Sequence, residues 1–375
     1  MPALRGRARR RLPLSVWVGG GFLLAMVLAC IGSLPWTLGA ASAGGGLTAR
    51  YKAGEFRESL LPPVWWGARD EVEARRLNSL VDPDVLQRLA AARGVEVDEL
   101  VKLTGRDGAD VRTHWPTRER PVAFLLGSDS LGRSVFVRCL TGGGVSLCIG
   151  IAAAALSVMI GTLYGAIAGY AGGVVDGVMM RIVDILYGLP YVLLVVLLAV
   201  AVDAAVENWI EARVRAGGAG VVSAEMRSVV DVVVLLVAIG GVSWLTMARV
   251  VRGQVLSLKS QPFMEAARAM GVGWFGQFRR HLLPNLVGPI IVYATLTVPQ
   301  AILQESFLSF LGIGVKPPLP SWGNLAADGL SELNPVRSNW WLLVFPCVLL
   351  GMTLLALNVL GEGMREAFDP KRGRR

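Results

Sequence analysis

Long runs of residues without charged side chains alternate with polar segments along this chain. Six of these runs approach or exceed the roughly 20 apolar residues that a helix needs to cross the hydrocarbon core of a bilayer. They are Leu12–Ala49, Cys139–Val175, Ile185–Val202, Val232–Ala248, Leu282–Gln304 and Ser338–Gly361. Backbone polar groups in lipid have to be paired within their own segment, so each run should form a helix. The pattern therefore predicts an all-α integral membrane protein with about six transmembrane helices.

Two long polar segments interrupt this pattern. The first, residues 41–138, follows the first helix, and within it Asp84–Thr104 is expected to form two short helices broken at Gly94. This segment either docks a partner outside the membrane or forms a packed cap with no specific role. The second, Asp203–Asp231, is rich in glycine near its middle and is expected to be an external loop. Pro190 lies inside the third run, where it should kink the helix because proline removes a backbone hydrogen bond.

The distribution of basic residues predicts the orientation of the chain in the membrane, because Lys and Arg accumulate in cytoplasmic loops. Arginines gather between Arg5 and Arg11, and further basic residues follow Lys371. An even number of spans places both termini on one side, which should be the cytoplasm. The loop between the fourth and fifth runs then also lies inside, and it too is basic. Ala41-Ser42-Ala43 resembles a signal-peptide cleavage site, but the apolar run before it is too long for a cleaved signal peptide.

Composition supports a membrane protein and excludes several other classes. The 375 residues are 53% hydrophobic and 17% charged, whereas a soluble domain has about 25% charged residues. The net charge of +9 comes from basic residues beside apolar runs, which favours contact with membrane lipid over nucleic acid. Four cysteines without a Cys-x-x-Cys pair and two histidines predict no metal site. The sequence contains no Gly-Lys pair and hence no phosphate-binding loop, so we expect no catalytic residue and no bound cofactor.

The basic loop between the fourth and fifth runs carries a pattern that predicts a helix, a tight turn and a second helix. Pro262 suits the first turn of a helix, where its missing N–H would be unpaired anyway. Gly271 suits the end of that helix, because glycine adopts positive φ easily, and the second helix should begin near Trp274. The first helix contains small and charged residues, namely Glu265, Ala266, Ala267 and Arg268. Its two alanines keep one face small, which would allow another protein to approach closely.

The same loop resembles a known family. Glu265-Ala266-Ala267, followed by Gly271 and later by Leu283-Pro284, is similar to the cytoplasmic signature of ABC importer permeases. Further resemblance to the oligopeptide/dipeptide/nickel branch of that family is found in Leu126–Ser134, Glu305–Gly312 and Gly361–Pro370. Ser134 departs from the aspartate that this branch has at the matching position.

The resemblance implies an ABC type-1 permease domain over residues 139–364, with a coupling loop at residues 260–283. Residues 1–40 would form a basic tail and the first helix, and residues 365–375 a cytoplasmic tail. The implied ATPase-coupling residues are Glu265, Ala266, Ala267, Arg268, Gly271 and Pro284. The implied partners are a homologous second permease, two cytosolic subunits that use ATP and Mg²⁺, and an external substrate-binding protein. The implied function is ATP-driven import of peptides or related small solutes across the cell inner membrane.

A few residues outside the loop are candidates for roles in transport or packing. Glu305 lies toward the outer end of the fifth run, and an ionisable group there indicates gating or a place in the translocation path. Small residues at every fourth position, which permit close helix packing, are Gly161, Gly165 and Gly169. A charged cluster expected to form salt bridges with one another or to contact the ATPase contains Asp176, Arg181 and Asp184.

Two other classes of protein remain open at this point. A secondary transporter or channel would need no ATPase, but it would leave the pattern in the coupling loop unexplained. A membrane scaffold that displays residues 41–138 would not require six spans.

Overall fold

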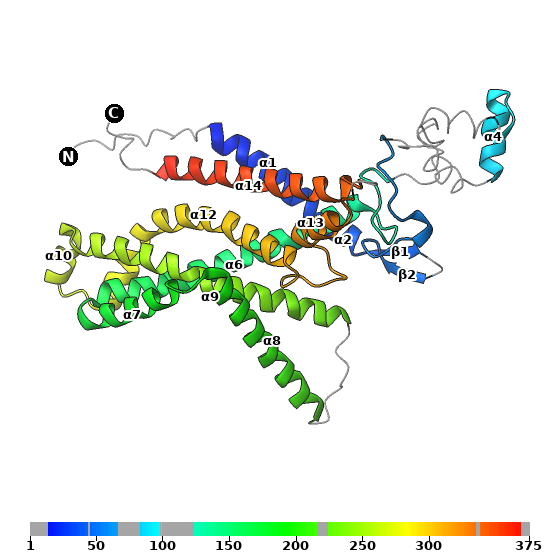
Figure 1. Ribbon diagram of the computed structural model, residues 1–375. Coiled ribbons are helices and arrows are strands. Elements are labelled where there is room, and N and C mark those ends of the chain that lie inside the picture. Colours follow the sequence, from blue (N-terminus) through cyan, green and yellow to red (C-terminus); the bar gives the residue numbers. More distant parts are fainter. Residues whose placement is uncertain are drawn as a thin grey trace. The chain divides into compact units, whose positions relative to one another are not determined.

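The computed structural model describes residues 14–43, 46–66, 83–97, 99, 124–215, 224–334 and 338–368. Within these ranges, six helices are long and apolar enough to cross a membrane, which confirms the predicted fold class (Figure 1). The candidate spans are Val16–Thr37, Val135–Ala171, Tyr191–Arg213, Met226–Lys259, Trp274–Phe310 and Trp341–Glu366. The basic stretches at both termini lie outside the described residues.

The long helices are joined by short helical elements and one small hairpin. The elements that form most of the candidate spans are α1 (Leu14–Cys30), α2 (Leu34–Thr37), α6 (Val135–Ala171), α8 (Tyr191–Arg215), α9 (Ala224–Lys259), α12 (Leu283–Phe310) and α14 (Trp341–Phe368). The shorter elements are β1 (Ala40–Ala43), β2 (Gly46–Ala49), η1 (Phe56–Glu58), α4 (Pro83–Arg93), α7 (Gly173–Tyr187), α10 (Pro262–Ala269), α11 (Trp274–Gln277), η2 (Phe278–Leu282) and α13 (Trp322–Ser331).

Internal contacts divide the chain into two compact units. The first contains Met1–Val27, Ser146–Lys316 and Gly351–Arg375, and the second contains Leu28–Val145 and Pro317–Leu350. The coupling loop and the other predicted site residues, Glu305 and the three glycines of α6, all belong to the first unit.

In the first unit, α6 packs closely on α9. A Cβ atom added at Gly161 would lie 2.5 Å from the Cβ of Met247, and one added at Gly169 would lie 3.0 Å from the carbonyl oxygen of Arg252. At Gly165 an added Cβ would collide with the carbonyl oxygen of Ala248. All three glycines therefore allow α6 to approach another helix of the same chain.

The second unit contains a charged turn organised by Asp129. Its carboxylate accepts hydrogen bonds from the backbone N–H groups of Leu131 and Arg133, both at 2.9 Å. It also pairs with the side chains of Arg133 at 2.7 Å and Arg138 at 2.6 Å. The stretch Leu126–Ser134, which resembles the permease branch in sequence, therefore has a structural role at the start of α6.

The end of the first apolar run, most of which falls in the polar segment expected at residues 41–138, is not helical. α2 ends at Thr37, and β1 then pairs antiparallel with β2. The sequence here has three consecutive glycines, and each glycine inside a helix would cost about 1 kcal/mol relative to alanine. A run that lacks charges can therefore include a hairpin as well as a helix.

The predicted loop Asp203–Asp231 is mostly helical. α8 continues to Arg215 and α9 begins at Ala224, so the segment between them is much shorter than predicted. Ion pairs support these helix ends, with Arg215 and Glu211 2.6 Å apart on α8 and Arg227 and Glu207 2.6 Å apart between the two helices. Charged residues end the apolar runs here. Both α8 and α9 nevertheless continue past the ends of these runs, because Ala, Glu and Arg favour helices.

Pro190 precedes α8 and does not kink a continuous helix as predicted. α7 ends at Tyr187 and α8 begins at Tyr191, which leaves Gly188, Leu189 and Pro190 outside both helices. The N–H of Leu194 donates to the carbonyl oxygen of Pro190 at 3.1 Å. Proline is well tolerated just before a helix because its missing N–H would have no helical partner there.

Candidate functional site

The coupling loop forms the helix, turn and helix that its sequence predicts. α10 begins at Pro262, Gly271 has a φ of +75°, and α11 begins at Trp274. The short π-helical turn η2 then leads into α12. The loop therefore lies between α9 and α12, the helices of the fourth and fifth candidate spans.

One face of α10 is buried and the other is exposed. Met264 and Ala267 have no exposed surface, whereas Glu265, Ala266 and Arg268 are exposed. The core that surrounds the buried face includes Met247, Val255, Leu282 and Leu286. The two alanines therefore differ, because Ala267 fixes α10 to its own chain and only Ala266 is available to a partner.

Apolar side chains enlarge the exposed surface of the coupling loop. Met270, Trp274 and Phe275 are exposed by 74%, 52% and 63%, and Phe263 on α10 is also exposed. Pro284 is exposed in the first turn of α12. Exposed apolar side chains gathered with charged ones are typical of a surface that another protein covers.

Tyr170, near the end of α6, connects the coupling loop to two long helices. Its hydroxyl donates to Oε1 of Gln277 at 2.8 Å, and Nε2 of Gln277 donates to the carbonyl oxygen of Val272 at 2.6 Å. Nζ of Lys259, at the end of α9, donates to the carbonyl oxygen of Tyr170 at 2.6 Å. No local sequence pattern marks these residues, because Tyr170 and Gln277 are 107 positions apart.

Two ion pairs hold α7 against α9. Arg252 donates from Nε and Nη2 to the two carboxylate oxygens of Asp176 at 2.5 and 2.6 Å, and Arg249 contacts Asp184 at 2.8 Å. The hydrogen bonds from Arg252 hold the pKa of Asp176 below its ordinary value. Salt bridges therefore fix this segment as predicted, but both carboxylates pair with arginines of α9 and not with Arg181.

Glu305 is completely buried and supports the turn that follows α12. Its carboxylate accepts hydrogen bonds from Oγ of Ser309 at 2.7 Å and from Oγ of Ser306 at 3.3 Å. Oγ of Ser309 in turn accepts a hydrogen bond from the N–H of Val315 at 3.0 Å. The carboxylate therefore acts on the turn through Ser309.

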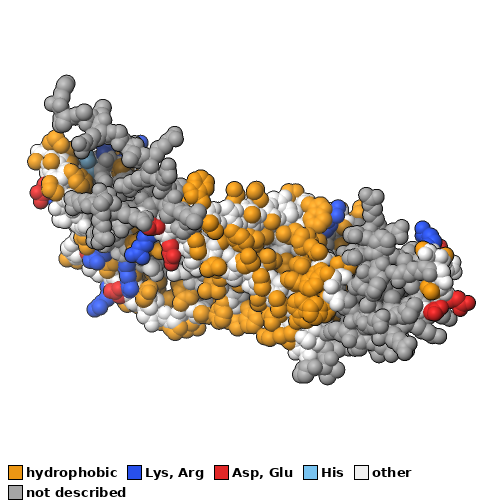
Figure 2. Space-filling model, turned by 90° about the horizontal axis from the view of Figure 1, so that it is seen from above, with side chains coloured by type: hydrophobic (Ala, Val, Ile, Leu, Met, Phe, Trp, Pro, Cys, Tyr) orange, Lys and Arg blue, Asp and Glu red, His pale blue; other side chains and the backbone are white. Residues whose placement is uncertain are grey.

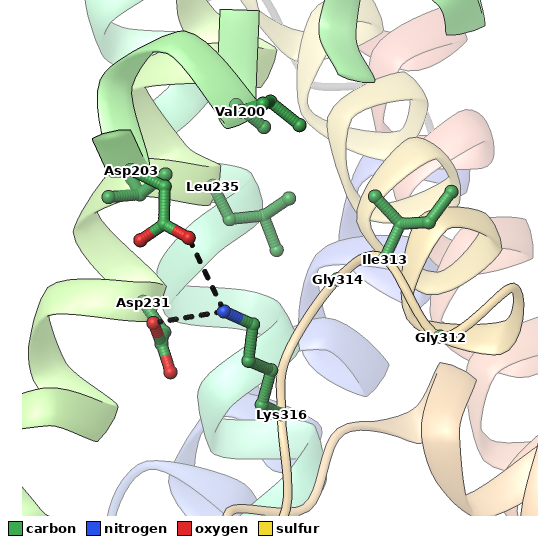
Figure 3. A pocket seen from close by; sticks show the side chains of 10 residues that line it. Val200, Asp203, Asp231, Leu235, Gly312, Ile313, Gly314 and Lys316 are labelled. Carbon is green, nitrogen blue, oxygen red and sulfur yellow. Dashed lines mark hydrogen bonds and ion pairs between the residues drawn. The ribbon is translucent and has the colours of Figure 1, made fainter. Parts of the chain in front are cut away.

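This turn leads to Lys316, which contacts two aspartates (Figure 3). Nζ of Lys316 lies 3.6 Å from Asp203 of α8 and 3.5 Å from Asp231 of α9. The three charged side chains line a cavity of about 200 Å³ together with apolar residues such as Val200 and Ile313. One lysine thus links α8 and α9 to the segment after α12. In the sequence, Asp203 and Asp231 had marked only the limits of a presumed loop.

The long helices have an apolar surface. On the face shown in Figure 2, hydrophobic side chains cover the middle of the helices, and most charged side chains lie toward the ends. On α8, for example, Leu193, Leu197 and Val200 are all exposed. Lipid or another membrane subunit can cover such a surface. Among the described residues, no group of three or more His, Cys, Asp or Glu side chains could hold a metal ion.

Six apolar helices, with a folded loop between the fourth and the fifth, define a multi-pass membrane protein. The chain belongs to the family described as binding-protein-dependent transport system inner membrane component, whose model matches residues 161–374, more than half of its length. This confirms the family resemblance found in the sequence.

Several relatives with curated names are similar to the chain. The oligopeptide transport system permease protein OppC of Escherichia coli (strain K12) is 52% identical over 141 residues, which are 38% of this chain and 46% of the relative. OppC of Haemophilus influenzae is 42% identical over 247 residues, or 66% of this chain and 70% of the relative. The dipeptide transport system permease protein DppC of Bacillus subtilis is 43% identical over 247 residues, which are 66% of this chain and 68% of the relative. The match thus spans less than half of the E. coli protein and about two thirds of the other two.

Proposed function

We propose that this chain is the transmembrane permease subunit of an ATP-driven importer for peptides or related small solutes. It would form the translocation path with a homologous second permease and receive its substrate from an external binding protein. Two cytosolic subunits would use ATP and Mg²⁺ and would bind the coupling loop. The chain would lie in the cell inner membrane with both termini in the cytoplasm. Its family and the names of its relatives, which are oligopeptide and dipeptide permeases, support this proposal.

The observation that carries the proposal is the construction of the coupling loop. Its exposed face offers Glu265, Ala266 and Arg268 to a partner, while Met264 and Ala267 fix it to the core. The Tyr170 hydrogen bonds attach the same loop to the ends of α6 and α9. A partner that moves α10 would therefore also move these long helices, and rigid-body movements of this kind switch a protein between two states.

We also propose that Glu305 is a positioning residue for an external gate. Its hydrogen bond to Ser309 supports the turn that carries Lys316 toward Asp203 and Asp231. These ion pairs would hold α8, α9 and the segment after α12 together in one state of the transport cycle. Their separation would open the outer end in another state.

Replacing Ala266 by tryptophan tests the coupling role. The larger side chain would project from the exposed face of α10 and keep the ATP-binding subunits at a distance. We expect the variant complex to lose these subunits during purification and to lose ATP-dependent uptake. Ala204→Trp, the same change at an exposed position of α8, should leave both unchanged. Full ATP-dependent uptake by the Ala266→Trp complex would contradict the coupling role.

A further inference from the structure

The break between α7 and α8 lies beside α9, near the end of its charge-free run at Ala248. The hydroxyl of Tyr191, the first residue of α8, is 3.3 Å from Oγ of Ser243 on α9. Ser243 lies inside the charge-free run Val232–Ala248 and, at 1.5 Å per residue, roughly 9 Å along α9 from Arg249, the first charged residue after that run. The guanidinium of Arg249 lies 4.0 Å from the centroid of the Tyr187 ring, so the non-helical residues 188–190 lie near the end of the charge-free run.

Within a membrane, non-helical backbone has to be buried in protein or line a water-filled cavity. Tyr187 just before the break and Leu189 within it are exposed by 53% and 47%, so the chain does not bury the break. A cavity of about 450 Å³ opens beside the break, between residues of α7, α8, α9 and α12. This volume falls within the roughly 300–1,000 Å³ of small-molecule sites.

Uncharged polar side chains line much of this cavity, namely Tyr191, Ser243, Thr246, Thr297, Gln300 and Gln304. The hydroxyl of Tyr191 donates to Oε1 of Gln304 at 2.5 Å, and Oγ of Ser243 lies 3.4 Å from the same oxygen. Thr246 and Gln300 are exposed. An amide left in contact with hydrocarbon would be strongly unfavourable, so this face meets water or solute and not lipid.

We propose that this cavity is the part of the peptide translocation path that this subunit contributes. Its hydroxyl and amide groups would form hydrogen bonds with the peptide backbone. This inference rests on the proposed function and adds the lining residues and their chemistry. The side chain of glutamine carries the same kind of donor and acceptor as a peptide group. None of the residues that line the cavity is charged, and the nearby guanidinium of Arg249 lies over the ring of Tyr187, where it pairs with Asp184. The backbone is the part that all peptides share.

Labelling of an introduced cysteine tests whether water and peptide reach the cavity. Cys148 and Cys347 are exposed and are first replaced by serine, whereas Cys30 and Cys139 are buried and remain. In the assembled importer, a Gln300→Cys variant should react with a water-soluble thiol reagent, and an excess of transported peptide should slow the reaction. Leu24→Cys, at an exposed apolar position of α1, should not react. A Gln300→Cys complex that takes up peptide but resists the reagent would overturn the inference.

A charge placed in the cavity tests the chemistry of its wall. Gln300→Glu should lower the uptake of acidic relative to basic peptides by about fivefold, because the introduced carboxylate repels acidic peptides and attracts basic ones. The ratio of two peptides in one preparation does not depend on how much complex has assembled. Gln254→Glu on α9 makes the same change at a residue that does not line the cavity, and it should leave the ratio unchanged. An unchanged ratio in the Gln300→Glu complex would overturn the inference.

Failure of the proposed function and failure of the cavity assignment give different results. If the unsubstituted importer takes up no peptide, the proposed function and the peptide chemistry of the cavity both fall. If the importer takes up peptide while both Gln300 variants behave like their controls, the proposed function stands and the path lies elsewhere.

Discussion

At the scale of single residues, the exposed surface of the coupling loop depends on the backbone conformation of Gly271. Its φ of +75° is easily adopted only by glycine, and no atom lies within 4 Å of the place where a Cβ would be. The N–H of Val272 then bonds to the carbonyl oxygen of Ala267 at 3.1 Å and closes the end of α10. The turn that joins α10 to α11 therefore depends on backbone geometry and not on packing at Gly271.

Gly271→Ala should strain this turn by about 1 kcal/mol and weaken the binding of the ATP-binding subunits about fivefold. The dissociation constant for the isolated ATP-binding subunits, measured on the permease in detergent, checks this. Gly273→Ala is the matched control, because Gly273 is equally open but has a φ of −63°. Equal effects of the two substitutions would show that the positive φ is not important.

Ser309 is the link between Glu305 and the turn that carries Lys316. Ser309→Ala would leave the N–H of Val315 without this hydroxyl acceptor, and we expect a cost of about 1–3 kcal/mol in stability and a lower rate of uptake. Ser306→Ala removes only the longer, 3.3 Å bond to Glu305 and should have a smaller effect. Thermal unfolding and uptake assays on both variants test this order. A larger effect of Ser306→Ala would contradict the proposed role of Ser309.

At the scale of elements, the close contact of α6 with α9 depends on the glycines of α6, which have no side chain. Gly165→Ala would drive a Cβ into the carbonyl oxygen of Ala248, and we expect the two helices to separate at a cost of about 1–3 kcal/mol. Gly253→Ala on α9 meets no atom within 4 Å and should be neutral or stabilising. Thermal unfolding of the purified chain in detergent checks both variants. Equal melting temperatures would contradict the packing argument.

The attachment of α7 to α9 should depend on pH. The pKa of Asp176 in the folded protein lies below the ordinary value of about 4, so its pair with Arg252 stabilises the fold fully above that pH and is lost as the pH falls through the lowered pKa. Asp176→Asn should therefore lower the melting temperature at neutral pH. The difference in melting temperature between this variant and the unsubstituted protein should become smaller as the pH falls below about 4. A difference that grows as the pH falls would contradict this sign.

The apolar runs predicted the six spans because the bilayer imposes a minimum length of apolar helix. Helix ends were harder to predict, since Ala, Glu and Arg extend α8 and α9 beyond the apolar runs, as far as Arg215 and back to Ala224. In the coupling loop, Pro262 and Gly271 predicted the elements because both act on the local backbone. Local patterns could not show that Ala267 faces inward, or that Tyr170 bonds to Gln277, because both facts depend on residues distant in sequence.

At the scale of the whole molecule, α12 connects the proposed sites. It begins beside the coupling loop, contributes Gln300 and Gln304 to the cavity, and carries Glu305 below the turn that leads to Lys316. Pro289 and Pro299 lie inside this helix, and prolines are common positions for helix bending. In the proposed mechanism, a movement of α10 would therefore reach both the cavity and the outer ion pairs through one helix.

The most direct test of the central claim is peptide uptake by the native complex, purified through this chain and reconstituted into vesicles. We predict that the complex contains a second permease and ATP-binding subunits, and that it accumulates peptide only when ATP is present on the side of the coupling loop. Purification of this chain alone or as a homo-oligomer, or uptake that follows an ion gradient without ATP, would contradict the account and favour a secondary transporter.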